Sequence, residues 1–316
     1  MSEFFVRLSR RALTGTVLLG IAQALGSMTA TAETRAVGCG TSRIGEITVA
    51  TLRNAPIVTL SANGSPITLL LDTGAEWTIL TPAAAKRVGA QTPRIEFQRQ
   101  MRGIGGSLAT NEVELRDFAA GGVAIPWRRV RVAAVNMPSV FSGPLDGVLG
   151  ADTLSSFDID LDLPHHRIVF YGKQSCPTAA PAWAEPYATI PARRSFSNHL
   201  SFTALLDGRQ IDTFIDSGAQ LSVLSRRAAA ALGVTEAALA RDRTTVTLGA
   251  AAERLNSHLH QFSRMEVGSE LVHNPILIVA DVNLRDADLI LGVDFIASRR
   301  VWLSYGSQQI FLSHRG

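Results

Sequence analysis

A short pattern that joins apolar residues to a single carboxylate occurs twice in this chain, and this repetition constrains the fold more than any other feature. The copies span Ile67–Leu80 and Ile211–Leu224. Within them an apolar run meets Asp72-Thr73-Gly74-Ala75 in the first copy and Asp216-Ser217-Gly218-Ala219 in the second. Each copy predicts a buried strand that delivers one Asp to a tight turn. A carboxylate beside apolar strands is costly without a partner, so we expect the two Asp residues to be each other's partner.

The similarity extends far beyond these two stretches. An offset of 144 residues superimposes Asp72 on Asp216, and further along an offset of 142 superimposes Gly150 on Gly292. The first offset also aligns four pairs of glycines: Gly64 with Gly208, Gly74 with Gly218, Gly89 with Gly233, and Gly105 with Gly249. Self-similarity at so long a period indicates two copies of one small domain. A chain of 316 residues is long enough for two hydrophobic cores.

Each copy shows the same order of predicted elements, most of them strands. Asn63-Gly64 and Asp207-Gly208 are typical of tight β-hairpins. Short helices are predicted at Pro82–Val88 and Arg226–Leu232, with Thr81 and Ser225 as N-caps and Gly89 and Gly233 as stops. Closing hairpins are expected at 157–171 and 301–313. The fold class is therefore all-β, with two lobes related by a pseudo-two-fold axis and one short helix in each.

The ends of the two copies define the predicted domains. We expect an N-terminal lobe at 33–176 and a C-terminal lobe at 197–316, and residues 33–45 are either a pro-segment or the first strand. The stretch 177–196 between them contains Pro177, Pro181, Pro186 and Pro191, which favours an extended, partly ordered linker.

Residues 1–32 resemble an export signal. Arg7, Arg10 and Arg11 precede the apolar stretch Ala12–Leu25, and Ala30-Thr31-Ala32 fits a signal-peptidase site. The alternative is an uncleaved anchor, but the apolar stretch is short for a membrane span. The paired arginines also fit a twin-arginine signal, so Sec and Tat export both stay open. We therefore expect an exported protein, periplasmic or secreted, without stable membrane insertion after cleavage.

The charge balance gives no sign of a nucleic-acid partner. The chain carries a formal net charge of +3, and this falls to +1 once residues 1–32 are set aside. Such a small excess does not predict binding to nucleic acid or to an anionic membrane surface. The two cysteines, Cys39 and Cys176, are a candidate disulfide in an oxidising compartment, with two unpaired thiols as the alternative.

Two Asp carboxyls held together can hydrolyse a peptide bond. Like charges a few ångströms apart do not both ionise easily, so the pair shares one proton. The ionised member then activates a water molecule, and the protonated member polarises the substrate carbonyl. Gly74 and Gly218 leave room for close backbone approach, and Thr73 and Ser217 place a hydroxyl beside each carboxylate. This chemistry requires no cofactor and no metal ion.

These motifs resemble the two half-sites of aspartic proteases. The size of each unit and the glycine-rich loop at Arg102–Gly106 are more similar to a retropepsin-like unit than to a pepsin lobe, so the chain resembles a tandem, single-chain protease of bacterial type. The resemblance covers about 45–172 and 197–314. It implies Asp72 and Asp216 as catalytic residues at the floor of a cleft. It also implies a flap from each lobe over an extended peptide: Gly103, Ile104, Gly105 and Gly106 in the first and Leu248 and Gly249 in the second.

One departure concerns the flap. Pepsin-like enzymes carry a flap tyrosine, whereas the tyrosines of this chain are Tyr171, Tyr187 and Tyr305, all outside the predicted flaps. The second loop also lacks the glycine cluster of the first, which predicts an asymmetric cleft.

Other acidic and histidine residues have simpler explanations. Asp152 and Asp294 are interpreted as helix caps. Asp158, Asp160 and Asp162 alternate along a strand, which is typical of a solvated face. His258 and His260 lack a third ligand at metal-binding spacing.

The sequence therefore predicts an exported aspartic endopeptidase that acts on peptides or proteins as a monomer. Two alternatives stay open: a catalytically silent peptide-binding protein on the same scaffold, and a dimer in which the lobes of two chains pair.

Overall fold

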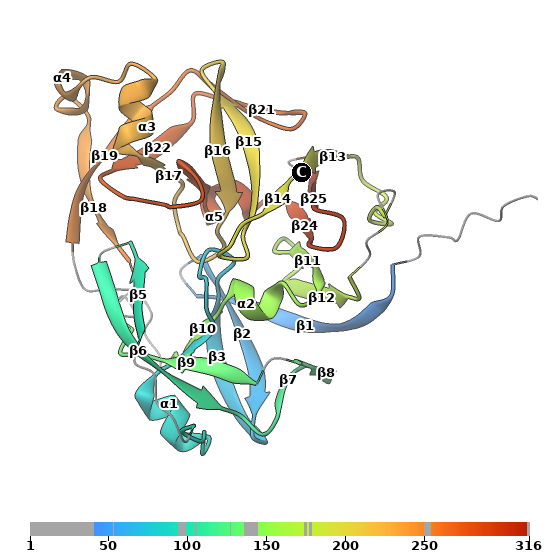
Figure 1. Cartoon of the computed structure of the whole chain (residues 1–316). Coiled ribbons are helices and arrows are strands. Elements are labelled where there is room, and N and C mark those ends of the chain that lie inside the picture. Colours follow the sequence, from blue (N-terminus) through green and yellow to red (C-terminus); the bar gives the residue numbers. More distant parts are fainter. Residues whose placement is uncertain are drawn as a thin grey trace, which may run out of the picture. The chain divides into compact units, whose positions relative to one another are not determined.

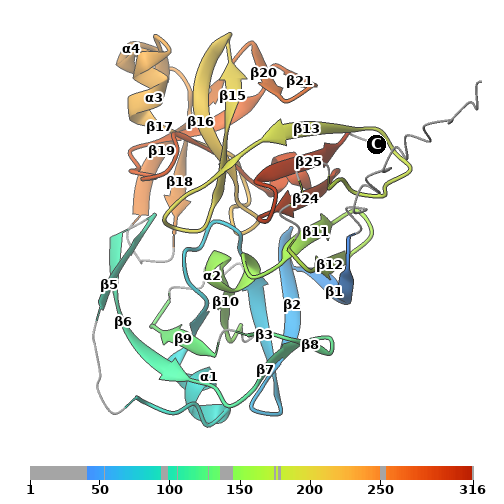
Figure 2. The same ribbon diagram turned by 45° about the vertical axis from the view of Figure 1, so that its right-hand side comes forward.

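The computed structural model describes residues 41–314 except 53, 94–98, 105, 127, 136–144, 174–175, 177–178 and 250–253. The predicted signal peptide (1–32), Cys39 and Gly105 lie outside the described residues. Residues Cys39–Gly316 form one unit by their internal contacts, and the two copies of the repeat lie within it. Figures 1 and 2 label the elements of this unit from two directions.

The first copy folds into strands joined by short turns, with two short helices. Its strands are β1 (Arg43–Leu52), β2 (Ala55–Ala62), β3 (Ser65–Leu71), β4 (Ile79–Leu80), β5 (Arg99–Gly103), β6 (Gly106–Glu114), β7 (Phe118–Ala120), β8 (Val123–Ala124), β9 (Arg129–Val132), β10 (Gly147–Leu149), β11 (Asp158–Asp162) and β12 (Arg167–Tyr171). Its helices are α1 (Pro82–Arg87) and α2 (Ala151–Leu154).

The second copy repeats this order with one more helix. Its strands are β15 (Leu200–Leu206), β16 (Arg209–Ile215), β17 (Val223–Ser225), β18 (Arg243–Leu248), β19 (Arg254–Gln261), β20 (Arg264–Val267), β21 (Glu270–His273), β22 (Ile276–Ala280), β23 (Leu289–Leu291), β24 (Arg300–Ser304) and β25 (Gln309–Ser313). Its helices are α3 (Arg226–Ala231), α4 (Glu236–Leu239) and α5 (Val293–Ile296). The stretch 177–196, interpreted as a linker, contains two strands, β13 (Tyr187–Pro191) and β14 (Arg193–Arg194).

The predicted hairpin turns and the two predicted helices, α1 and α3, are confirmed by their local geometry. Asn63 and Gly64 have φ of 51° and 77°, and Asp207 and Gly208 have 48° and 80°, so both hairpins turn through two left-handed residues. The hydroxyls of Thr81 and Ser225 accept the backbone N–H groups that open α1 and α3. The four-residue helices α2, α4 and α5 are too short to show a helical period, and the sequence indicates α2 and α5 only through the interpretation of Asp152 and Asp294 as caps.

A parallel insertion completes each lobe. Strand β10 pairs parallel with β3 and antiparallel with β4, and β23 does the same between β16 and β17. The apolar-apolar-Gly segments of the sequence are these inserted strands. They pair with the strands that lead into the two Asp residues, so they fix the position at which each acidic turn begins.

The closing hairpins of the two copies join in one sheet, in the order β13-β25-β24-β11-β12-β1. Its centre is the antiparallel pair of β11 and β24, in which Asp160 faces Trp302 and Asp162 faces Arg300.

The prediction that Asp158, Asp160 and Asp162 form a solvated face is wrong, since all three are at most 1% exposed. Arg300 donates to both oxygens of Asp160, and its guanidinium lies 3.6 Å from Asp162. Asp158 accepts from Ser304 and from the Gly306 backbone. Partners about 140 residues away therefore stabilise Asp158 and Asp160 inside the protein, and Arg167 of the same hairpin pairs with Asp162 at 2.9 Å.

Two small apolar clusters face away from the main core, one in each lobe. The first contains Leu70, Ile79 and Val148, and the second contains their counterparts Phe214, Val223 and Ile290. Ala55 belongs to the first cluster, whereas its counterpart at the offset of 144 residues is a histidine, His199. The two lobes thus differ in polarity at one buried position of otherwise equivalent clusters.

Candidate active site

Asp72 and Asp216 lie at the ends of equivalent strands. Asp72 follows β3 and its backbone N–H donates to the Leu149 carbonyl of β10. Asp216 follows β16 and donates in the same way to Leu291 of β23. The inserted strands therefore hold the two turns at matching positions.

The two carboxyls face each other across the boundary between the lobes. A Cβ built on Gly74 would lie 2.3 Å from Cγ of Asp216, and a Cβ built on Gly218 would lie 2.3 Å from Cγ of Asp72. Each glycine thus packs against the opposite Asp, and any side chain there would displace it. This close approach explains the glycines better than the dihedral angles do, because neither residue has a positive φ.

Each carboxylate accepts two backbone N–H groups from its own turn. Oδ1 of Asp72 accepts from Gly74 at 3.0 Å and from Ala75 at 2.8 Å. Oδ1 of Asp216 accepts from Gly218 at 2.8 Å and from Ala219 at 3.2 Å. These bonds fix one oxygen of each carboxyl in its turn, so the other oxygen is the one left for reaction.

Thr73 and Ser217 tie the two turns together by four reciprocal hydrogen bonds. The Thr73 hydroxyl donates to the Ile215 carbonyl at 2.7 Å, and the Ser217 hydroxyl donates to the Leu71 carbonyl at 2.7 Å. Each hydroxyl also accepts the backbone N–H of the other residue, at 3.0 and 3.1 Å. Both side chains are at most 2% exposed. This network crosses between the lobes and fixes the separation of the two turns.

The electrostatics of the pair are those of a shared proton. Burial, the negative charge of Asp216 and a hydrogen bond with the Asp216 side chain raise the pKa of Asp72 well above its ordinary value. The Ala75 and Gly74 N–H groups lower that pKa, but their effect is smaller. Asp72 therefore keeps a proton under conditions in which an isolated Asp is ionised.

Asp152 and Asp294 support the turns in a different way from the one predicted. The N-caps of α2 and α5 are Gly150 and Gly292, and neither helix has a side-chain cap. Oδ1 of Asp152 instead accepts from the backbone and the hydroxyl of Thr78, at 2.8 and 2.7 Å. Asp294 accepts from the backbone and the hydroxyl of Ser222, but through its two different oxygens. The helix-cap interpretation is corrected: these carboxylates bind the end of each acidic turn.

The predicted flap residues lie on two hairpins whose ends meet. Gly103 and Gly106 pair at the end of the β5–β6 hairpin, and Leu248 ends β18. A Cβ built on Gly249 would lie 1.8 Å from the carbonyl oxygen of Ile104, and Ile104 packs on the apolar cluster of the second lobe. Gly105 lies outside the described residues. Ile104 and Gly249 thus bring the two loops into contact.

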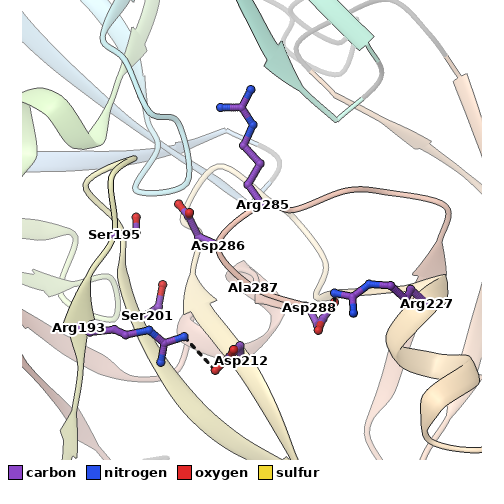
Figure 3. A pocket seen from close by; sticks show the side chains of 9 residues that line it. All are labelled: Arg193, Ser195, Ser201, Asp212, Arg227, Arg285, Asp286, Ala287 and Asp288. Carbon is purple, nitrogen blue, oxygen red and sulfur yellow. Dashed lines mark hydrogen bonds and ion pairs between the residues drawn. The ribbon is translucent and has the colours of Figure 1, made fainter.

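A cavity of about 310 Å³ lies in the second lobe. It is lined by Arg193, Ser195, Ser201, Asp212, Arg227, Arg285, Asp286, Ala287 and Asp288 (Figure 3). Two of its arginines are paired, Arg193 with Asp212 at 3.0 Å and Arg227 with Asp288 at 2.5 Å. The cavity is not lined by the two candidate catalytic residues, and Asp286 connects it to them through His199.

Sequence reasoning missed His199 and Asp286. The Nδ1 atom of His199 lies 3.3 Å from Oδ2 of Asp286. Neither residue belongs to a motif, and the available signal is the mismatch between His199 and Ala55 when the copies are superimposed.

Three further predictions concern metal ligands, a membrane span and the cysteines. Among the residues that it describes, no three His, Cys, Asp or Glu side chains are grouped as metal ligands, and His260 pairs with Asp242 at 2.6 Å. In the same part of the chain, no helix has the length and apolar character needed to cross a membrane. Cys176 is disulfide-bonded, and Cys39 lies outside the described residues.

Comparison with known proteins defines the class. The crystal structure of the aspartic proteinase from Irpex lacteus matches with a TM-score of 0.56 and 13% identity, over 86% of this chain and 97% of that chain. The two lobes therefore have the fold of an aspartic proteinase. The family model described as aspartyl protease matches residues 58–153 and 202–295, one stretch in each lobe. The chain belongs to this family, as a tandem, retropepsin-like member. No curated protein sequence matches it significantly.

Proposed function

We propose that the protein is an exported aspartic endopeptidase that hydrolyses peptide bonds with a water molecule activated by Asp72 and Asp216. The observation that carries this proposal is the pair of facing carboxyls, each held by its own turn and joined by the reciprocal Thr73–Ser217 hydrogen bonds. Family membership and fold support a peptide substrate.

The mechanism follows from the unequal protonation of the pair. Asp72 holds the proton because its pKa is raised, and Asp216 acts as the base. Asp216 takes a proton from the bound water as the water oxygen attacks the peptide carbonyl, while Asp72 donates its proton to the carbonyl oxygen. The tetrahedral intermediate then collapses, the C–N bond breaks, and the proton on Asp216 passes to the leaving nitrogen. The hydroxyl proton of the intermediate returns to Asp72, which restores the starting state.

The flap hairpins complete the proposed site. Ile104 and Gly249 are in contact, and Ile104 packs on the same apolar cluster as Ala219 of the Asp216 turn. An extended peptide held beside the carboxyls presents its backbone to the water, and exclusion of bulk solvent strengthens the electrostatic interactions. The ends of the β5–β6 and β18–β19 hairpins are therefore the proposed flaps.

We assign residues 1–32 to a signal peptide and the mature chain to the periplasm or the extracellular space. The disulfide at Cys176 supports an oxidising compartment. We further propose that one chain forms the whole site as a monomer. The support is the β11–β24 pair, where the acidic side chains of one copy meet Arg300 of the other. Two first copies paired in this way would oppose like charges instead.

The decisive experiment replaces either candidate catalytic residue. Asp72→Asn and Asp216→Asn should each lower kcat about 10²- to 10⁴-fold on a peptide library digested at acidic pH. Asp117→Asn is the matched control, because its exposed carboxylate accepts a backbone N–H through one oxygen that Asn retains. Unchanged turnover in either folded variant contradicts the mechanism. Peptide binding without cleavage by the parent protein, including no effect of a statine-type inhibitor, identifies a silent binding protein. Light scattering on the active protein separates the monomer from the dimer.

A further inference from the structure

His199 occupies a position that sets the second lobe apart from the first. In the antiparallel pair of β15 and β16, Ser201 faces Phe214. If this register is continued by two residues, just past the ends of the two strands, His199 lies opposite Asp216. The same construction in the first lobe, where Ile57 faces Leu70, places Ala55 opposite Asp72. An imidazole therefore stands beside one carboxyl of the pair, and a methyl group stands beside the other.

The imidazole is buried and its position is fixed by its neighbours. His199 is 7% exposed, and its ring stacks on Phe214 with 4.5 Å between the ring centroids. Such diagonal contacts are expected between cross-strand neighbours on one face of a sheet. The stacking holds the ring plane, so the two nitrogens point in defined directions.

The polar atoms around this ring are incompletely paired. Among the described residues, neither ring nitrogen of His199 makes a hydrogen bond of acceptable geometry, and the buried Oδ2 of Asp286 and Oγ of Ser201 also lack one. Buried polar groups in folded proteins are nearly always hydrogen-bonded, so exceptions call for an explanation. Ser201 and Asp286 line the cavity shown in Figure 3. Oδ2 of Asp286 lies 3.3 Å from Nδ1 of His199.

Charged groups face the imidazole from both lobes. Burial lowers the pKa of His199, whereas the carboxylates of Asp216, Asp286 and Glu76 and the Gly74 carbonyl raise it. Three arginines also line the cavity beside Asp286. Arg193 and Arg227 are paired with carboxylates, and Arg285 directly precedes Asp286 in the chain. The effect of burial is the largest, so the pKa of His199 lies below its ordinary value of 6.5 and the ring gains its proton at a more acidic pH than a free imidazole.

We propose that His199 is a positioning residue for the pair: in its protonated form it stabilises the negative charge on Asp216 and so leaves the shared proton on Asp72. The proposal rests on the proposed function, because only a catalytic pair needs its proton on a defined member. In a symmetric pair the proton lies on either Asp with equal free energy. Only the state with the proton on Asp72 gives the acid and the base that the proposed mechanism uses. His199 removes this degeneracy, since no matching group stands beside Asp72.

The first test follows the titration of His199 itself by NMR and needs no activity. Seven histidines are present, and the spectrum of His199→Gln identifies the signal that belongs to this one. Asp216→Asn removes the charge next to the ring, so the pKa of His199 should fall by about one unit. Asp72→Asn leaves the Asp216 charge in place and should not lower it. Equal shifts in the two variants, or no shift in either, overturn the proposal even if the protein cleaves peptides.

The second test is the pH profile of kcat/KM. A cation beside Asp216 favours the singly ionised pair, so its loss should move the acid limb of the profile upward. We expect a shift of about 0.5 to 1 pH unit for His199→Gln, while His199→Lys, which keeps a cation, restores the original limb. Asp286→Asn keeps the ring but removes the carboxylate that favours its protonation, and should shift the limb by a smaller amount.

His165→Gln is the matched control, because His165 pairs with Asp162 at 2.7 Å on the sheet between the lobes, away from the proposed site. Its profile should coincide with that of the parent protein. A uniform loss of activity in His199→Gln with an unchanged acid limb would assign the residue a packing role and overturn the proposal. If the parent protein cleaves no peptide, the proposed function is contradicted, and the NMR titration still decides the role of His199.

Discussion

The two lobes are nearly identical where the carboxyls meet and different one layer away. Both turns hold their Asp with two backbone N–H groups, and both contribute one hydroxyl to the reciprocal hydrogen bonds. Behind the turns, Ala55 of the first lobe corresponds to His199 of the second. The symmetric residues bring the two acids together, whereas the asymmetric ones distinguish them. Duplication alone supplies a pair, and divergence between the copies gives the members separate roles.

The sheet between the lobes teaches the same lesson. At the offset of 142 residues, Asp158 of β11 corresponds to Arg300 of β24. The copies therefore became complementary where they touch: an acidic strand meets a strand that begins with an arginine. This difference favours pairing of the two lobes of one chain over pairing of two first lobes, which would place Asp160 of one copy opposite the same residue of the other.

The largest effect expected from any test of the symmetry comes from the glycines of the turns. Gly74→Ala and Gly218→Ala should each lower kcat/KM about 10²-fold or more, because the new methyl group would lie 2.3 Å from Cγ of the opposite Asp and displace it. Since the two contacts are equivalent, the two losses should be similar. Steady-state kinetics on one peptide substrate makes the comparison.

Gly172→Ala provides the control for a glycine replaced by alanine. A Cβ there would meet its nearest neighbour at 3.8 Å, an ordinary contact, so activity should be retained. If only one of the two turn variants lost activity, the equivalence of the two turns would be refuted.

The next effect tests the complementary strands. Arg300→Met should lower the free energy of unfolding by about 3–5 kcal/mol, because it leaves the carboxylate of Asp160 buried without its cation, whereas Asp162 keeps Arg167 at 2.9 Å. Urea denaturation measures this. Arg193→Met breaks an ion pair whose side chains are both more than half exposed, and should cost at most about 1 kcal/mol. Equal losses in the two variants would mean that the β11–β24 pair does not depend on Arg300.

A smaller effect is expected from the hydroxyls that join the lobes. Thr73→Ala and Ser217→Ala each remove two hydrogen bonds to buried backbone groups, at a total cost of about 1–3 kcal/mol. Thr73→Ser keeps the hydroxyl and should restore most of the stability. Ser217→Thr adds a methyl group at a fully buried position and should not. Thermal unfolding of the four variants compares the two hydroxyl positions. If Thr73→Ser and Ser217→Thr were tolerated equally, the space around the two side chains would be the same.

The parts of the molecule that could be predicted from sequence are those with local signals repeated in register. The hairpin turns, the N-caps at Thr81 and Ser225 and the facing Asp residues all follow from a few neighbouring residues that occur twice. The helix α4 was missed because a single turn shows no period, and α2 and α5 were indicated only by their acidic residues.

Residues whose environment comes from a distant strand were harder to interpret. The alternating Asp158, Asp160 and Asp162 suggest a solvated face until Arg300 is placed beside them. His199 carries no motif, and its importance depends on a cross-strand register. Both cases leave a trace in the sequence, because the superimposed copies differ there in charge: Asp158 against Arg300, and Ala55 against His199. Differences between the copies indicate these contacts better than the local pattern does.

The smallest effect concerns the acids that bind the ends of the turns. Burial raises the pKa of Asp152 and of Asp294 above the ordinary value of 3.8. The folded state then binds a proton more tightly than the unfolded state, so the stability present below about pH 3.8 is lost as the pH rises through the raised pKa. Asn does not ionise, so Asp152→Asn should flatten this decline, by up to about 1.4 kcal/mol per pH unit. Asp294→Asn should flatten it less, because both oxygens of Asp294 accept from Ser222, whereas Oδ2 of Asp152 has no partner among the described residues. Unfolding free energies between pH 3 and 7 give the slopes, and a steeper or unchanged slope in Asp152→Asn would show that the buried carboxyl is already accommodated as an anion.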